Sequence, residues 1–206
     1  MKTRQTLSGK FEEIIYARLE PGDDLLRAIW EICKKHDVKT GILLDATGSM
    51  HNVIVQRFPH QDHGGAGIDL VNIPGPLEVS AHGIIGMGWA PDKSVTPPSV
   101  VAPPGVTGFG FGGFEGHETP YCHVHITVSS ASQTVCGHLM EGSLLHGITK
   151  EVDPITRRGE VPEHFTVAIA KVSGVVLRAT WDKTGYYHDL VPAWGSWEGC
   201  KNGVGS

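Results

Sequence analysis

One segment of the chain repeats its apolar residues at helical spacing, whereas most of the other apolar runs have the length of β-strands. Within residues 23–37 the apolar side chains recur at three- and four-residue steps, as on one face of an α-helix: Leu25, Leu26, Ile29, Ile32 and Cys33. Acidic residues begin this segment and basic residues end it, which the helix dipole favours. The segment therefore predicts one amphipathic helix, in which Cys33 is a buried thiol.

Short runs of strand-forming residues surround the expected helix. The expected strands are residues 11–19, 40–47, 52–58, 77–85, 123–129, 135–141, 166–172 and 175–181. Turn-forming residues separate two pairs of these runs and predict two hairpins. The first hairpin turns at SSASQT, residues 129–134, and the second turns at Ser173 and Gly174. Each hairpin would bring consecutive strands side by side.

Residues 86–120 break the strand pattern and are expected to form a long loop. Five prolines fall between positions 91 and 104, and six glycines fall between 105 and 116. Neither a helix nor a strand ladder continues through such a run. Loops of this length are commonly functional lids, oligomer arms or disordered segments. We expect one domain over residues 1–206, with this loop insertion and an extended C-terminal segment at 155–206.

Charge and hydropathy argue against several classes of function. Acidic residues outnumber basic residues by 22 to 17 and the net charge is −5, so double-stranded DNA is a poor electrostatic partner. No run approaches the ~18 apolar residues of a membrane helix. The opening residues, MKTRQTLSGK, lack the apolar stretch of a signal peptide. We expect a cytoplasmic protein that binds a small molecule or another protein.

Two histidines alternate with one valine in the first strand of the first hairpin, and a third histidine lies in the second strand. Side chains at i and i+2 of a strand share a face, so His123 and His125 point together, and His138 can lie across from them. Three neutral imidazoles with an open position are the ligand set of a catalytic zinc site, although nickel, copper and iron also accept imidazole. The pattern therefore predicts a divalent metal site, with zinc as the first choice. Ordinary core or surface histidines are the alternative.

Other polar residues are candidates for work beside such a metal. An ion with an open position polarises substrate oxygen atoms, and this chemistry commonly uses a carboxylate or an arginine nearby. Glu78 is a candidate general acid or base, although a solvent-facing edge strand also explains its charge. Arg18 is a candidate anchor for a substrate carboxylate, or a partner of an acidic neighbour, and Glu141 is a further candidate carboxylate. His82 and His117 are candidates for a fourth ligand or a proton shuttle.

Three stretches of the sequence, in this order, resemble the plants-and-prokaryotes conserved (PPC) domain, also called domain of unknown function 296. They are LEPGDDLLRAIWEICKKHDVKTGILLDATGSMHNVIV, PGPLEVSAHGIIG and CHVHITVSSASQTVCGHLMEG, within residues 11–85 and 121–153. The helix start PGDDLL, the triplet PLE, H-x-H and GHL carry the resemblance most specifically. Plant members carry AT-hooks before the domain, but RRGE at residues 157–160 lacks the Arg-Gly-Arg-Pro core of such a hook.

The resemblance implies an α+β fold with a largely antiparallel β-sheet, flanked by a few helices, that assembles as a homotrimer. It implies that His123, His125 and His138 hold a zinc-type ion, as in many prokaryotic members. It also implies a fold similar to that of zinc-dependent acetolactate decarboxylase. Two functions follow as hypotheses. One is a metal-dependent enzyme (lyase or decarboxylase, isomerase or hydrolase) acting on a small carboxylate or oxygen-rich metabolite. The other is a trimeric metal-binding regulatory or DNA-binding-related module without catalysis.

Overall fold

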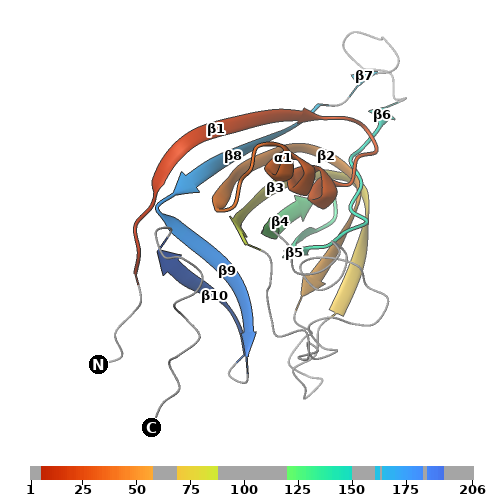
Figure 1. Cartoon of the computed structure of the whole chain (residues 1–206). Helices are drawn as coiled ribbons and strands as arrows, with labels where there is room; N and C mark the ends of the chain where they lie inside the picture. Colours follow the sequence, from red (N-terminus) through yellow and green to blue (C-terminus); the bar gives the residue numbers. More distant parts are fainter. Residues whose placement is uncertain are drawn as a thin grey trace.

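The computed structural model describes residues 6–57, 69–87, 120–149, 161–162, 164–182 and 185–192. In this part of the chain, one α-helix lies within the curve of the β-strands (Figure 1). The helix is α1 (Leu25–Lys35). The strands are β1 (Lys10–Leu19), β2 (Gly41–Arg57), β3 (Asp69–Gly86), β4 (Tyr121–Ser129), β5 (Thr134–Leu139), β6 (Ile148–Thr149), β7 (Val161–Pro162), β8 (Phe165–Ser173), β9 (Val175–Asp182) and β10 (Gly185–Pro192).

Six strands form one antiparallel sheet in the order β1-β8-β2-β3-β4-β5. One edge of β2 pairs first with β8 and then, at its end, with β5, through Val55 opposite Leu139 and Gln56 opposite His138. The other edge of β2 pairs with β3. Since β5 also pairs with β4, strands β2 to β5 form a closed ring of paired strands.

The two predicted strands 40–47 and 52–58 are parts of the single strand β2, and 77–85 is the second half of β3. The pairing of β2 with β3 shifts register at two places, between Leu43 and Thr47 and between Met50 and Asn52. Such irregularities bend a strand without ending it. The turn-like residues in the middle of β2 therefore mark a bend, and the predicted break between two strands is wrong.

One predicted hairpin is present, and the other is wrong. β4 and β5 pair as a hairpin, whose turn is closed by the Ser130 amide donating to the Gln133 carbonyl at 2.9 Å. The predicted pairing of 166–172 with 175–181 does not occur, because β8 lies between β1 and β2 and both of its edges are occupied. The chain instead turns away from the six-stranded sheet at Gly174, where φ is +84°, and β9 then pairs with β10. The expected C-terminal segment thus contributes a strand pair.

The hydrophobic core lies between α1 and the inner face of the sheet. Asp24 caps the helix, since its carboxylate accepts a hydrogen bond from the Arg27 amide at 3.0 Å. Leu25, Leu26 and Ile29 are completely buried, and each such burial contributes about 1.5–3 kcal/mol. The apolar stripe predicted from the sequence is thus the packed face of α1. The thiol of Cys33 is buried on this face, as predicted.

The outer face of β3 and β4 carries alternate residues of each strand. On β4, Val124, Ile126 and Val128 are buried, so the residues between them point outward. The outward residues are Ile84, His82, Ser80 and Glu78 on β3, and His123, His125, Thr127 and Ser129 on β4. We call this surface the histidine face.

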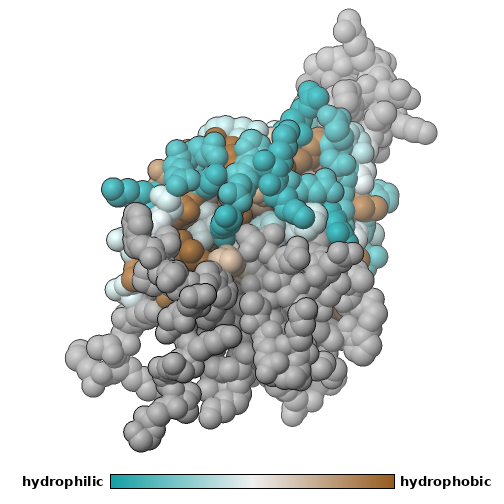
Figure 2. Space-filling model, viewed as in Figure 1, coloured by the Kyte–Doolittle hydropathy of each residue, from teal (hydrophilic) through white to brown (hydrophobic). Residues whose placement is uncertain are grey.

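The described residues hold one α-helix where a few were expected. Residues 88–119 of the predicted loop, and parts of the predicted C-terminal segment, lie outside the described ranges. From the viewpoint of Figure 1, the described surface mixes hydrophilic and hydrophobic residues (Figure 2). Within the same ranges, no helix has the length and apolar character needed to cross a membrane.

Candidate metal centre

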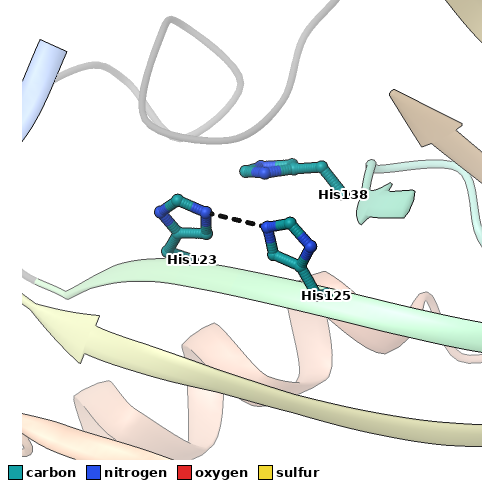
Figure 3. Close-up of side chains that lie close together, drawn as sticks. All are labelled: His123, His125 and His138. Atoms are coloured by element: carbon teal, nitrogen blue, oxygen red, sulfur yellow. Dashed lines mark hydrogen bonds between the residues drawn. The ribbon is translucent and has the colours of Figure 1, made fainter. Parts of the chain in front are cut away.

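Alternation along β4 carries His123 and His125 to the histidine face. Val124, between them, has no exposed surface, so it holds the strand against the core while both imidazoles point outward. Their Nε2 atoms lie 3.2 Å apart, and their rings are stacked with centroids 5.2 Å apart (Figure 3). The H-x-H spacing thus places two imidazole nitrogens beside each other.

His138 joins this pair from the neighbouring strand β5. It lies opposite His125 in the ladder between β4 and β5. Its ring centroid is 4.7 Å from that of His123 and 5.4 Å from that of His125. One possible ligand atom from each histidine lies within 4.8 Å of the other two, and no other group of three or more potential metal ligands is so arranged among the described residues. The convergence expected from the sequence is present.

Gly137 explains how β5 can hold its histidine so close to both neighbouring strands. A Cβ atom at this position would lie 2.8 Å from Cβ of Val55 and 3.1 Å from the carbonyl oxygen of Gln56. Real side chains do not approach so closely, so glycine lets β5 pack against β2 at this point. The next residue is His138, whose position therefore depends on that close packing.

The protonation of His125 and His138 and the spacing of the imidazoles suit a bound cation. Two ligands about 2.05 Å from zinc, at the tetrahedral angle, lie about 3.3 Å apart, close to the separation of the two Nε2 atoms on β4. Burial lowers the pKa of His138 well below 6.5, and the neighbouring His123 and His125 lower it further. Burial, followed by the charge of His82, also lowers the pKa of His125. His125 and His138 are thus neutral near pH 7, the form that binds metal ions.

Two residues of β3 flank the imidazoles on one side. His82 lies opposite His125, and Ile84 lies opposite His123. Both side chains are exposed on the histidine face, with Ile84 42% accessible. The residue type of His82 predicts a place beside a metal site, whereas no local signal in the sequence predicts the position of Ile84. The surroundings of the site therefore combine a titratable ring with an accessible hydrocarbon side chain.

Two further residues beside the histidines were not predicted from the sequence. Gln56 of β2 lies opposite His138, and Tyr121 contacts His123 edge to face with ring centroids 6.3 Å apart. The i, i+2 spacing of Tyr121 and His123 was a usable signal for a shared face. Nothing in the sequence links Gln56 with His138, because their proximity comes from the register of strands far apart along the chain.

Glu78 and Arg18, the residues expected to assist catalysis, lie apart from the three imidazoles. Glu78 is exposed on the histidine face, four residues along β3 from His82, which corresponds to about 13 Å in a strand. Arg18 is exposed on β1 and donates a hydrogen bond to Glu20 at 3.2 Å. Strands β8, β2 and β3 lie between β1 and β4. His117 lies outside the described residues.

Glu141 belongs to a different polar cluster. Its carboxylate forms an ion pair with Arg27 of α1, and its side chain is 14% exposed. The amide of Gly142 donates to the carboxylate of Asp24, whose pKa is raised by burial. These contacts fasten the turn after β5 to the first turn of α1. Glu141 therefore stabilises the fold next to His138 without joining the three imidazoles.

Residues 6–101 match the family model of the Plants and Prokaryotes Conserved (PCC) domain. This match identifies a PCC domain in the chain over those residues. The PCC match covers β1, α1, β2 and β3, whereas the three histidines follow it in the sequence. The family match alone therefore assigns these histidines no role.

Solved structures support the PCC fold over nearly the whole chain. A metal-containing protein from Archaeoglobus fulgidus superposes with a TM-score of 0.59 at 15% identity, covering 91% of this chain and 99% of that chain. A PPC protein from Pyrococcus horikoshii gives 0.56 at 17% identity, covering 90% and 96%. A protein from Bacteroides thetaiotaomicron, named as a candidate DNA-binding protein, gives 0.54 at 12% identity, covering 89% and 96%. No protein of curated function matches the chain significantly.

Proposed function

We propose that this PCC-domain protein is a metal-dependent enzyme acting on a small carboxylate or another oxygen-rich metabolite. The observation that carries the proposal is the group of three histidines on an outward face of the sheet. Two of them are held neutral by their surroundings, and three neutral ligands leave a divalent ion its full charge. The metal-containing relative from Archaeoglobus fulgidus adds support.

His123, His125 and His138 would hold the ion, with zinc as the first choice. Such an ion supplies Lewis acidity towards a carbonyl or carboxylate oxygen. His125 is exposed, whereas His123 and His138 are half-buried, so the group can be reached from outside the sheet on the side of His125. His82, opposite His125, is the nearest side chain on β3 that can donate or accept a hydrogen bond with a substrate oxygen. This arrangement suits a lyase or decarboxylase, an isomerase or a hydrolase.

Glu78 and Arg18 keep proposed roles as general acid or base and as carboxylate anchor. Glu78 shares the histidine face and would act on the far end of a ligand that extends along β3. Arg18 lies on β1, an edge strand that β8 separates from β2. Its participation would require the neighbouring subunit of the homotrimer that the family resemblance implies.

The alternative is a trimeric metal-binding regulatory module without catalysis. The candidate DNA-binding relative favours it, although the net charge of −5 argues against direct contact with a phosphate backbone.

A comparison of loaded, metal-free and mutant protein separates the two functions. The purified protein would be analysed for bound metal and assayed for turnover of a panel of small 2-oxo, 2-hydroxy and 3-oxo acids. An enzyme loses turnover on chelation and in His138→Ala, and it retains turnover in the matched histidine variant His51→Ala, because His51 is exposed on β2 outside the group of three. Bound metal with no turnover in any form would favour the regulatory module.

A further inference from the structure

We infer that the ligand of this centre is an organic monoanion with a hydrocarbon arm, and that the arm lies on Ile84 and Ile42 while the anionic oxygen atoms face the three imidazoles. This inference rests on the proposed function, because it names the class of molecule that the same centre would take. Its evidence is separate, however, and comes from the residues beside the histidines.

An unbroken row of aliphatic residues crosses the sheet and ends at a metal-ligand candidate. In the strand register, Ile14 lies opposite Ala170, Ala170 opposite Ile42, Ile42 opposite Ile84, and Ile84 opposite His123. Directly opposed residues of an antiparallel pair have Cβ atoms about 5 Å apart. Ile84 is therefore in reach of a group bound at His123, and Ile42 is one further step away. We call this row the apolar row.

The isoleucines of the apolar row are accessible. Ile84 is 42% exposed, Ile42 is 38% exposed and Ile14 is 50% exposed. A single exposed isoleucine is common on protein surfaces. Exposed isoleucines that lie in register and lead to a group of converging imidazoles form a surface on which hydrocarbon would be removed from water.

The other side of the histidines is polar, which sets the direction of the ligand. The row through His82, His125 and His138 is followed by the row through Ser80, Thr127 and Cys136. Hydrocarbon is therefore favoured on the side of Ile84, and polar groups are favoured on the side of Ser80 and Thr127.

The charges of the described residues in the three rows around the histidines favour a ligand with one strong anionic group. The residues of the apolar row and of the two rows just described include no lysine or arginine. A bound divalent ion would then be the local positive charge, and it can balance one carboxylate. Ligands with several anionic groups, such as polyphosphates, would leave charge without a partner.

Binding of simple acids to the cobalt-loaded full-length protein tests the inference. Cobalt in a histidine site absorbs visible light, and this spectrum changes when an anion binds to the ion. The probes are acetate and hexanoate, which share a carboxylate and differ in the length of the hydrocarbon arm. We expect hexanoate to bind at least about tenfold more tightly than acetate, since each buried methylene adds about 0.8 kcal/mol.

Matched substitutions locate the arm. Ile84→Thr keeps the β-branched shape that suits a strand, and we expect it to weaken hexanoate by roughly fivefold or more while acetate binding stays the same. Ile14→Thr is the control, because Ile14 lies in the same row but two strands beyond Ile42. Ile42→Thr, tested with octanoate, gives a second measurement if Ile84→Thr fails to fold.

Three outcomes would overturn the inference. Equal affinities for acetate and hexanoate would show that the hydrocarbon arm does not pack against an apolar surface of the protein. An equal loss in Ile14→Thr, or a change of oligomeric mass in the Ile84→Thr variant, would show that the row is a contact between copies of the chain. A protein that binds no cobalt would remove the proposed function as well, whereas the first two outcomes leave the metal centre intact.

Discussion

Gly137 of β5 lies so close to Val55 of β2 that a Cβ atom on the glycine would be 2.8 Å from Cβ of the valine. We expect Gly137→Ala to push β5 away from β2, at a cost of about 1–3 kcal/mol in the free energy of unfolding. The substitution should also weaken metal binding, because His138 is the next residue. Denaturant unfolding and competitive metal titration measure the two effects.

Gly147→Ala is the matched control for that substitution. A Cβ atom at Gly147 would have no neighbouring atom within 4 Å, so we expect little change in stability or in metal affinity. Equal effects of the two alanine variants would mean that the close packing of β5 against β2 does not position the histidine.

Removal of any one of the three imidazoles should abolish stable metal binding. His123→Ala, His125→Ala and His138→Ala would each leave two ligands, and we expect the metal content to fall by at least tenfold relative to the parent protein. His51→Ala is the control, since His51 is exposed on β2 outside the group of three. Elemental analysis after dialysis provides the comparison. Normal metal content in the three alanine variants would place the ion elsewhere.

The metal-free protein should lose stability as the pH falls below about 6.5. The pKa of His138 is lowered by burial in the folded protein, so the unfolded chain takes up a proton there before the folded chain does, and acid favours unfolding. Above about pH 6.5, His138 is neutral in both the folded and the unfolded chain, so its contribution to the free energy of unfolding no longer changes with pH. Urea unfolding at about pH 7.5 and about pH 5.5 measures the difference. His138→Gln should show a smaller difference, and an unchanged one would contradict the assignment.

Glu141→Gln should destabilise the protein while metal binding persists. Glu141 pairs with Arg27, which is 39% exposed, so solvent screening keeps the expected loss at about 1–2 kcal/mol, below that of a fully buried pair. A double-mutant cycle with Arg27→Met isolates the interaction free energy between Glu141 and Arg27. A large loss of bound metal at equal stability would instead make Glu141 part of the centre.

Direct DNA binding is expected to be absent. The net charge of −5 opposes the counterion release that drives protein–DNA association. Fluorescence anisotropy with a labelled duplex at low salt should show no saturable binding by the metal-loaded protein. Saturable affinity that falls steeply with added salt would support the DNA-binding-related alternative.

Local features of the sequence predicted what depends on local spacing. The stripe of α1, the hairpin of β4 and β5, and the convergence of His123, His125 and His138 all follow from residues close together in the chain. The periodicity of helices and strands and the reach of one turn suffice for each.

Features that depend on distant pairings were not predictable in the same way. The placement of β8 between β1 and β2, which separates it from β9, is decided by competition among strand edges across the whole chain. The positions of Gln56 and Ile84 beside the histidines depend on register. The distances of Glu78 and Arg18 from the three imidazoles could not be predicted for the same reason. The type of a residue suggests a chemical role, but it does not determine how far the residue lies from a site.

The closure of β2 with both β3 and β5 has a consequence for protein engineering. The strands that bear the imidazoles are tied into a hydrogen-bonded ring, and β2, β3, β4 and β5 close this ring by pairing with one another. Connections of other lengths and compositions could then be grafted between those strands while the coordinating nitrogens keep their places. The scaffold is thus suited to libraries in which the connection between β3 and β4 is varied around a constant group of three imidazoles.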